Sequence, residues 1–272
     1  MGMFTGKTAV VTGASSGIGR AVALRLGEAG AHVFAAGRRA EALADTVEAV
    51  AVAGGAATAV AADLREPGEI QGLVDRAMAD TGRLDVMVNN AAVSFHGPLA
   101  DGDPGSWREM LEVNVLALAL GSQAAVRAMR ACKAQGHTVN ISSSTTRMQA
   151  PGFYGATKTA VNAITATLRQ ELENDTIRVV TVIPGATATN LGRHNGGSLL
   201  RGLAASLGQE IRPASEGLFA PEELDQVAAA ASQVLAGADD VARAVLFAVT
   251  QPIQLSISEI TVQAARRPSV PA

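Results

Sequence analysis

The sequence predicts an α/β protein: a single doubly wound Rossmann-type domain, with a parallel sheet of about seven strands and helices on both faces. Three observations predict this fold. Short apolar runs alternate along the chain with segments of helical apolar spacing. A glycine-rich turn joins the first apolar run to the first helical segment. The 272 residues can bury one full core, and no Pro/Gly/Ser-rich linker divides them.

Composition argues against several kinds of function. Lys and Arg number 22 against 25 Asp and Glu, and no dense basic run suggests nucleic acid or an anionic membrane as a partner. We expect no membrane span, because no uninterrupted apolar segment reaches the length needed to cross a bilayer. The first residues fit neither a cleavable signal nor a myristoylation pattern, so we expect a cytoplasmic protein. Cys132 is the single cysteine, and the four histidines lack metal-ligand spacing, so we expect no metal.

A first strand over 7–12 is followed at once by the glycine-rich segment 13–19 and a helix. Gly13 permits a tight turn, Gly17 lets the backbone approach a pyrophosphate, and Gly19 lets helix and strand pack closely. The flanking strand and helix favour nucleotide binding over an empty turn, although the spacing is GxxxGxG and not GxGxxG. The contacts predicted in this turn are Gly13, Ser15, Ser16, Gly17, Ile18 and Gly19.

The second strand, over 31–36, decides the expected cofactor. An acid at this strand end would bind the 2′-hydroxyl of NAD, whereas an arginine accommodates the 2′-phosphate of NADP. Gly37 stands where the acid would be, and Arg38 follows it. We therefore predict NADP (NADPH), with Ser15 as a second phosphate contact. The alternative is a solvated arginine pair that starts the helix over 41–52.

The third and fourth strands also end in candidate contacts. Asp63 follows the third strand and could accept a hydrogen bond from an adenine amino group, with Leu64 beside it. Asn90 follows the fourth strand and could hold strand ends together, while the small Ala91 lets a cofactor lie against the backbone. We predict these strands over 56–61 and 84–88, and a helix between them over 67–80.

Tyr154 and Lys158 stand four apart at the start of a helix predicted to end at about Asn174, so they share one helix face. A phenol titrates near pKa ~10, and a nearby ammonium favours the phenolate, which would suit acid–base chemistry near neutral pH. Alone the pair is weak evidence, because many solvated helices carry such residues. The nucleotide-binding motifs upstream make it more specific.

Together these motifs resemble the classical short-chain dehydrogenase/reductase family over about residues 5–190. The resemblance rests on TGASSGIG at 12–19, Asp63, NNAA at 89–92, and the segment from Tyr154 to Lys158. Ala92 replaces the family's usual glycine. The resemblance implies an oxidoreductase in which Tyr154 transfers a proton, while Lys158 binds the nicotinamide ribose and lowers the pKa of the phenol.

Two further segments take their expected roles from the resemblance. Asn114, within a helix predicted over 107–131, falls where the family carries its catalytic asparagine. This implies a local helix break whose freed carbonyl binds a water beside the lysine; the alternative is a capped or solvent-facing asparagine. After a strand over 177–183, PGATAT resembles the family's PGxxxT segment, which contacts the nicotinamide. The implied contacts are Pro184, Gly185, Thr187 and Thr189.

The serine that donates a hydrogen bond to the substrate oxygen in this family has two candidates here. A strand over 138–141 leads into consecutive serines, and matching the strand residues selects Ser143. Only eleven positions then separate it from Tyr154, a shorter interval than family members carry. Ser142 is therefore kept as the alternative, although loops tolerate deletion better than strands tolerate a change of register.

Glycines and prolines loosen the pattern over 190–236, which we interpret as a candidate substrate lid or as an insertion used at the surface or in subunit contact. A helix over 239–251 and a strand over 255–262 follow. The segment ISEITV within that strand resembles the branch of 3-hydroxy acid and serine-type dehydrogenases.

The function predicted from these features is hydride transfer between NADP(H) and a small secondary alcohol or ketone. The resemblance also implies a homo-oligomer, either a dimer or a tetramer. One alternative is a catalytically idle NADP-binding regulatory protein that senses redox state. Another is epimerase or dehydratase chemistry with a tightly retained cofactor.

Overall fold

The computed structural model describes residues 2–149, 152–191, 201–202, 204–205 and 219–266. These residues contain seven strands, namely β1 (Thr8–Thr12), β2 (His32–Gly37), β3 (Ala56–Ala61), β4 (Val86–Asn89), β5 (Gly136–Ile141), β6 (Ile177–Pro184) and β7 (Glu259–Val262). The strands form one sheet in the order β3-β2-β1-β4-β5-β6-β7, and every neighbouring pair is parallel. The predicted fold class is confirmed.

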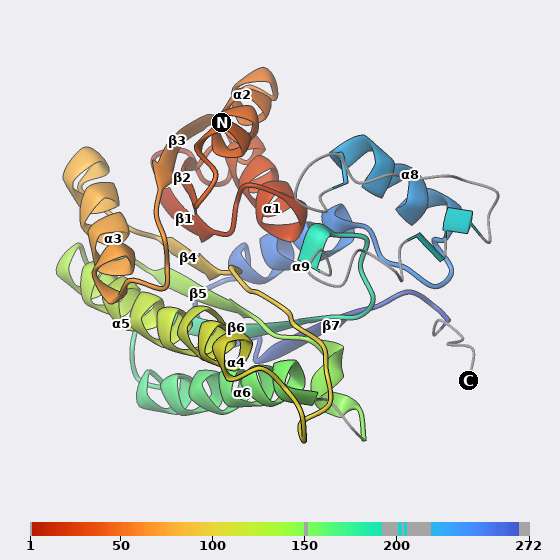
Figure 1. The fold of residues 1–272 in the computed structure, drawn as a ribbon. Coiled ribbons are helices and arrows are strands. Elements are labelled where there is room, and N and C mark those ends of the chain that lie inside the picture. The colour runs from red at the N-terminus through yellow and green to blue at the C-terminus, as the bar shows by residue number, and fades with distance from the viewer. Residues whose placement is uncertain (1, 150–151, 192–200, 203, 206–218, 267–272) are drawn as a thin grey trace.

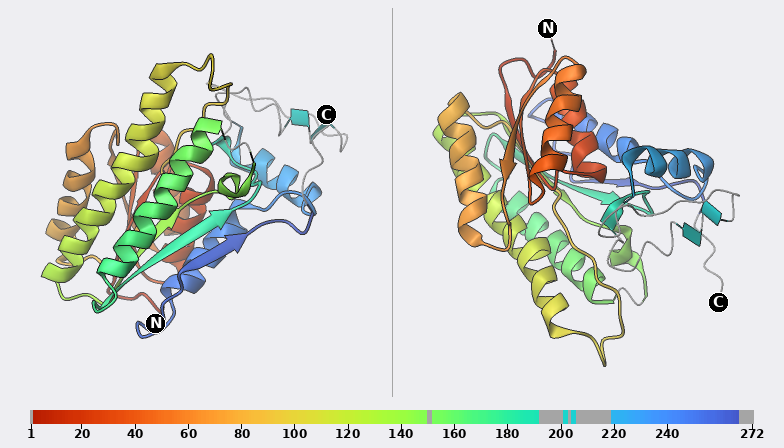
Figure 2. Two further views of the ribbon diagram at one scale, coloured as in Figure 1. Left: turned by 90° about the horizontal axis from the view of Figure 1, so that it is seen from below. Right: turned by 45° about the horizontal axis from the view of Figure 1, so that its top comes forward.

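Helices cover both faces of the sheet (Figure 1), and the left view of Figure 2 shows three of them side by side on one face. Buried residues of β1 alternate between the two layers, with Val11 in one core cluster and Val10 in the other, as the two-residue period of a strand requires. One face carries α1 (Gly17–Glu28), α2 (Ala40–Val52) and α9 (Ala238–Val249), and the other carries α3 (Pro67–Thr81), α5 (Ala117–Ala131) and α6 (Gly152–Glu171).

The helix that contains Asn114 is longer and less regular than predicted. It begins as α4 (Pro104–Leu111), where the Asp103 carboxylate accepts hydrogen bonds from two backbone N–H groups and caps the first turn. It passes through a π-helix over Glu112–Leu116 and continues as α5. A π-helix interrupts the regular i→i−4 hydrogen bonding, so the helix break implied at Asn114 is present.

Among the described residues, the continuous helix Pro104–Ala131 is the one segment long and apolar enough to cross a membrane by length and composition. From the sequence we expected no such segment. Half of its most apolar window is buried inside the fold, and α5 packs against α3 and β4. A helix buried in this way is apolar because it belongs to the core.

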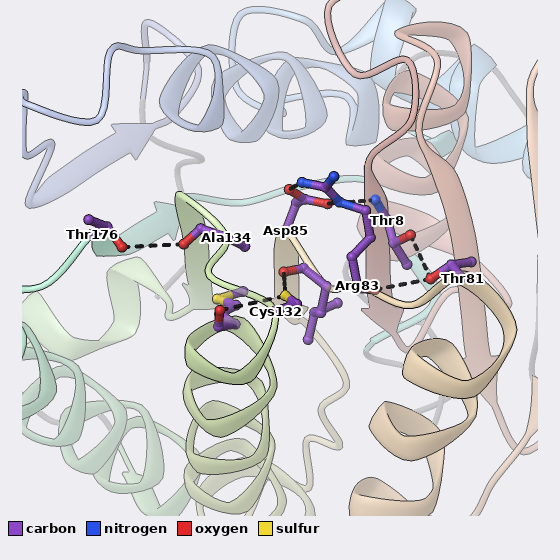
Figure 3. Close-up of polar contacts among 9 residues, drawn as sticks. Thr8, Thr81, Arg83, Asp85, Cys132, Ala134 and Thr176 are labelled. Carbon is purple, nitrogen blue, oxygen red and sulfur yellow. Dashed lines mark hydrogen bonds and ion pairs between the residues drawn. The ribbon is translucent and has the colours of Figure 1, made fainter.

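Polar contacts close the amino-terminal edge of the sheet (Figure 3). The Asp85 carboxylate is buried just before β4, and it accepts hydrogen bonds from the backbone N–H of Thr8, at 3.0 Å, and from the Arg83 guanidinium. Nearby, the Thr176 hydroxyl donates to the Ala134 carbonyl at 3.3 Å and joins the starts of β6 and β5. The opposite, carboxyl-terminal edge is therefore where a ligand has access to the strand ends.

The C-terminal part differs most from expectation. β7 begins at Glu259 and not at 255, because Leu255 donates its N–H to the Pro252 carbonyl in a turn that precedes the strand. Within the predicted lid, α8 (Pro221–Ala230) packs through Leu224 against Ala188. Residues 192–200, 203 and 206–218 of that segment lie outside the described residues, so the lid stays a prediction.

Candidate active site

A cavity of about 1680 Å³ opens at the carboxyl-terminal edge of the sheet, larger than the roughly 300–1,000 Å³ typical of a pocket for one small ligand. Gly19 and Asn114 are buried outside its lining. The remaining predicted site residues all line it, namely Gly13, Ser15, Ser16, Gly17, Ile18, Arg38, Asp63, Leu64, Asn90, Ala91, Ser143, Tyr154, Lys158, Pro184, Gly185, Thr187 and Thr189.

The glycine turn depends on the absence of side chains. Gly13 and Gly17 adopt φ of +67° and +54°, in the left-handed region that favours glycine. A Cβ added at Gly19 would lie 2.3 Å from the Gly13 carbonyl oxygen, so only glycine lets α1 begin this close to β1. The result is a stretch of backbone that a ligand can approach closely, next to the N-terminus of a helix.

The ends of β1 and β4 are fastened together where the sheet order reverses. The Thr12 hydroxyl accepts hydrogen bonds from the backbone N–H groups of Asn90, at 3.0 Å, and Ala91, at 3.1 Å. In return, the Asn90 amide donates to the Thr12 carbonyl at 2.8 Å. Asn90 therefore holds strand ends together as predicted, and the floor of the cavity between the two strands is rigid.

Two arginines follow β2, and they contact different partners. Arg38 forms an ion pair with Glu109 of α4, with Nη1 and Oε1 3.6 Å apart. Arg39 donates a hydrogen bond to the Ser15 hydroxyl at 3.4 Å. Arg38 and Ser15 were predicted as phosphate contacts, whereas Arg39, which also lines the cavity, and Glu109, the partner of Arg38, were not predicted. Arg39 could have been found from its position one residue further along, but nothing in the sequence pairs Glu109 with β2.

The carboxylate predicted to meet adenine is already paired. Asp63 receives hydrogen bonds from the Arg65 guanidinium, including 3.0 Å contacts from Nε. These bonds, with a smaller contribution from the charge of Arg38, hold the pKa of Asp63 below its usual value. Asp63 therefore faces the cavity as an anion with acceptor oxygens held in place.

Tyr154 is buried at the inner end of the cavity, with 6% of its surface exposed. Burial raises the pKa of the phenol to about 12, against an opposing hydrogen bond with Ser143. The Lys158 ammonium lies 5.9 Å from the centre of the tyrosine ring and donates to the Ile141 carbonyl at 2.9 Å. In the free protein the pKa of the phenol is thus set by burial and Ser143, and the lowering expected from Lys158 stays a prediction.

The two candidate serines face different ways. The Ser142 hydroxyl is buried and donates to the Asn162 side-chain oxygen at 2.6 Å. Ser143 contacts the phenol and also accepts a hydrogen bond from the backbone N–H of Thr145 at 3.2 Å. Ser143 is thus the serine beside Tyr154, and the short interval between the two residues does not prevent this contact.

Asn114 is fully buried, and both the oxygen and the nitrogen of its side-chain amide are hydrogen-bonded. Its amide group exchanges two 2.9 Å hydrogen bonds with the backbone of Val93, and it donates a third to the Thr157 hydroxyl. Thr157 in turn donates to the Tyr154 carbonyl at 2.6 Å. A solvent-facing asparagine is therefore ruled out. The side chain fixes the π-helix against α6 through Thr157.

The loop after β6 is held by backbone hydrogen bonds to Ala236, in the C-terminal part of the chain. Ala236 exchanges backbone hydrogen bonds with Ala186 and Ala188 on either side of Thr187. Further along, Asn190 and Phe219 form a two-way clamp: the Asn190 amide donates to the Phe219 carbonyl at 3.0 Å and accepts from its N–H at 2.8 Å. The sequence analysis missed this clamp, since no pattern links residues so far apart.

Comparison with known proteins identifies the family of the chain. Residues 7–197 match the family model described as short chain dehydrogenase. An uncharacterized oxidoreductase of Methylorubrum extorquens is 41% identical over 200 residues, which are 72% of this chain and 79% of that protein. A metagenomic short-chain oxidoreductase solved in complex with NADP is 32% identical, with a TM-score of 0.73 over 99% of this chain and 100% of that one. A short-chain dehydrogenase/reductase of Burkholderia phymatum in complex with NAD is 29% identical, with a TM-score of 0.75 over 96% and 90% of the two chains. The chain belongs to the short-chain dehydrogenase family and is an oxidoreductase of that family.

Proposed function

We propose that this protein transfers hydride between NADP(H) and a small secondary alcohol or ketone, with Tyr154 as the general acid and base. The observation that carries the proposal is the buried Tyr154 phenol, which contacts Ser143 and shares one cavity with Lys158 and the glycine turn. A phenol in that position can exchange a proton with a substrate oxygen that Ser143 also contacts. When bound, the nicotinamide supplies the hydride.

The cavity lining fits a dinucleotide. The glycine turn leaves backbone bare where a side chain would clash, since a Cβ at Gly13 would come within 2.8 Å of the Asn90 amide. Gly17 and Ile18 at the start of α1 would bind the pyrophosphate. Asp63 would accept from the adenine amino group, while Thr187 and Thr189 would hold the carboxamide of the nicotinamide.

NADP(H) is preferred over NAD(H) because positively charged side chains lie where its 2′-phosphate would bind. Two arginines follow β2, and Gly37 occupies the place of the acid that would bind an unmodified ribose. Similar structures have been solved with NADP and with NAD, so family membership does not itself select between them. Arg38 and Arg39 support NADP(H).

The proton chemistry follows from the environment of Tyr154. With a pKa of about 12 in the free protein, the phenol is neutral near pH 7 and ready to donate a proton. As charge develops on the carbonyl oxygen, the Ser143 hydroxyl would stabilise it, and the Lys158 ammonium would offset the phenolate that forms. The backbone carbonyl freed at Asn114 would hold the water that connects Lys158 to solvent. Positioned acid–base groups of this kind are typically worth about 10²- to 10⁴-fold in rate.

The proposal also covers the substrate lid and the oligomeric state. Segment 190–236 would serve as the substrate lid. Support comes from the packing of α8 against Ala188, which lies between Thr187 and Thr189 in the loop after β6. The chain would work as a cytoplasmic homo-oligomer, either a dimer or a tetramer. Support comes from Leu111 and Leu116 on the long helix, which are 47% and 45% exposed and offer apolar surface that a second copy could cover.

The test is NADPH oxidation with a panel of ketones, followed by absorbance. Tyr154→Phe should lose at least about 100-fold in turnover and bind NADPH almost as well as the wild type, because the hydroxyl is needed for proton transfer only. Ser143→Ala should lose turnover as well. The matched control is Ser142→Ala, whose hydroxyl faces Asn162, and it should keep most of the activity.

Each rival function gives a different result in the same experiment. Wild-type turnover in Tyr154→Phe would remove the tyrosine from its role. Tight NADPH binding with no turnover on any ketone would favour an idle redox-sensing protein. Conversion of substrate without net NADPH consumption would favour an epimerase or dehydratase.

A further inference from the structure

The ion pair between Arg38 and Glu109 joins two elements at a residue, Arg38, that lines one end of the cavity. Arg38 follows β2, whereas Glu109 lies on α4, and their charged atoms are 3.6 Å apart. Arg38 also lines the cavity together with Asp63 and Leu64, at the end where the adenosine of a dinucleotide would lie. One of the two arginines that favour a 2′-phosphate is therefore already engaged by a carboxylate of the protein.

The charges around this end of the cavity nearly cancel. Arg65 pairs with Asp63, and its raised pKa reflects that carboxylate first, with smaller contributions from Glu109 and Glu112. Asp63 in turn is influenced by Arg38. Glu109 thus pairs with Arg38 and adds to the negative potential at Arg65, and it carries the same sign of charge as the phosphate that would approach Arg38.

From this geometry we propose that Glu109 is a selectivity-determining residue that weakens binding of the 2′-phosphate by occupying Arg38. The inference rests on the proposed use of NADP(H). To contact Arg38, the phosphate must displace or share the Glu109 carboxylate and remain close to its negative charge. A 2′-hydroxyl has no such conflict, so Glu109 should lower NADPH affinity and leave NADH affinity nearly unchanged.

The expected size is modest, because both side chains are partly exposed, Arg38 by 42% and Glu109 by 24%. Exposed ion pairs are screened by water and salt, and they typically change an equilibrium by about 1.5- to 5-fold. Removal of the carboxylate charge should therefore tighten NADPH binding by roughly 2- to 5-fold. The effect should shrink as the salt concentration rises.

The experiment measures dissociation constants by calorimetry for the wild type, Glu109→Gln and Glu173→Gln. Glu173 is exposed in the turn after α6, so its variant carries the same change in net charge away from the cavity. NADPH and NADH are one pair of probes. Adenosine 2′,5′-bisphosphate and AMP are a second pair, which reports the 2′-phosphate without the nicotinamide. Glu109→Gln should tighten binding of both 2′-phosphorylated probes, and Glu173→Gln should change neither.

Equal or weaker binding of the 2′-phosphorylated probes in Glu109→Gln would overturn the inference, because the carboxylate would then be neutral or would support Arg38. The proposed use of NADP(H) is tested separately, by the dissociation constants of the wild type alone. A wild type that binds NADH and AMP more tightly than their 2′-phosphorylated counterparts would reject NADP(H) as the preferred cofactor, whereas the change between the wild type and Glu109→Gln tests the role of the carboxylate itself.

Discussion

Burial, more than charge pairing, sets the protonation of the two titratable groups proposed for catalysis. Burial raises the pKa of Tyr154 to about 12. The Lys158 ammonium donates to the Ile141 carbonyl, and burial lowers its pKa to about 8. Desolvation disfavours the charged form of each group, so the two pKa values move in opposite directions. The free protein therefore holds a neutral phenol beside a lysine that is costly to keep charged.

The first residue-scale prediction concerns this cost. Lys158→Met should raise the free energy of unfolding at pH 7 by up to about 3 kcal/mol, since a shift from 10.5 to about 8 corresponds to that much. The pKa of Lys158 is lower in the folded protein than in the unfolded chain, so wild-type stability rises between pH 8 and 10.5 as the lysine loses its proton. The advantage of the variant should be complete below pH 8 and decrease above it.

Chemical denaturation across pH 7 to 10 measures this difference. Lys133→Met is the control, because Lys133 is exposed and its removal should give no such pH dependence. A stability difference between Lys158→Met and the wild type that is flat with pH would contradict the prediction. Turnover should be lost in Lys158→Met at every pH if the lysine acts as proposed.

At the level of single residues, the sequence indicates which residues gather but not which way they face. The order of the strands brings Arg38, Ser143 and Tyr154 to one edge, and the periodicity is enough to predict that. The hydrogen bonds that turn Ser142 toward Asn162 and Arg39 toward Ser15 depend on side-chain geometry between distant elements. Local patterns carry no signal for such contacts.

At the level of elements, the loop after β6 is shaped by contacts from the C-terminal part of the chain. Asn190 is 7% exposed, and its side-chain amide supplies the hydrogen-bond partners of the backbone N–H and carbonyl of Phe219. A buried backbone group without a partner costs about 1–3 kcal/mol. Removal of the clamp should therefore loosen Thr187 and Thr189 more than it unfolds the protein.

The element-scale prediction is that Asn190→Leu raises the KM for NADPH by about 5- to 30-fold, as expected for a loss of about 1–2 kcal/mol in loop order. It should lower kcat much less, because Tyr154 and Ser143 lie on other elements. Hydrogen exchange should become faster in peptides covering 186–191. Asn174→Leu, in an exposed turn, is the control and should change neither quantity. Unchanged exchange in that loop would show that the clamp does not hold it.

Most elements were predicted to within a few residues, because apolar periodicity and the glycine turns mark them directly. β3 matches its prediction at both ends. The π-helix around Asn114 was implied by family resemblance and not by periodicity, since one extra residue in a turn barely changes the apolar pattern. β7 was predicted too long because alternation continues into the turn at Leu255, where no neighbouring strand is paired.

At the scale of the molecule, the cavity lies where the two halves of the sheet meet. β1, β2 and β3 carry the glycine turn, the arginines and Asp63, whereas β4, β5 and β6 carry Asn90, Ser143 and the loop with Thr187 and Thr189. Thr12 and Asn90 join the halves at the bottom of this crevice. A ligand that spans the crevice adds contacts between them, so binding should stabilise the fold as a whole.

The whole-molecule prediction is a shift in thermal unfolding. NADPH at about 100 times its dissociation constant should add about 2.7 kcal/mol to the free energy of unfolding, which raises the Tm of a protein of this size by about 5–10 °C. At equal concentration, adenosine 2′,5′-bisphosphate should give a smaller shift, because it reaches only the half of the cavity formed by β1 to β3. Tyr154→Phe should respond to NADPH like the wild type. If the nucleotide fragment matched the full shift, the β4 to β6 half would contribute nothing to binding, and the nicotinamide site proposed beside Tyr154 would have to be placed elsewhere.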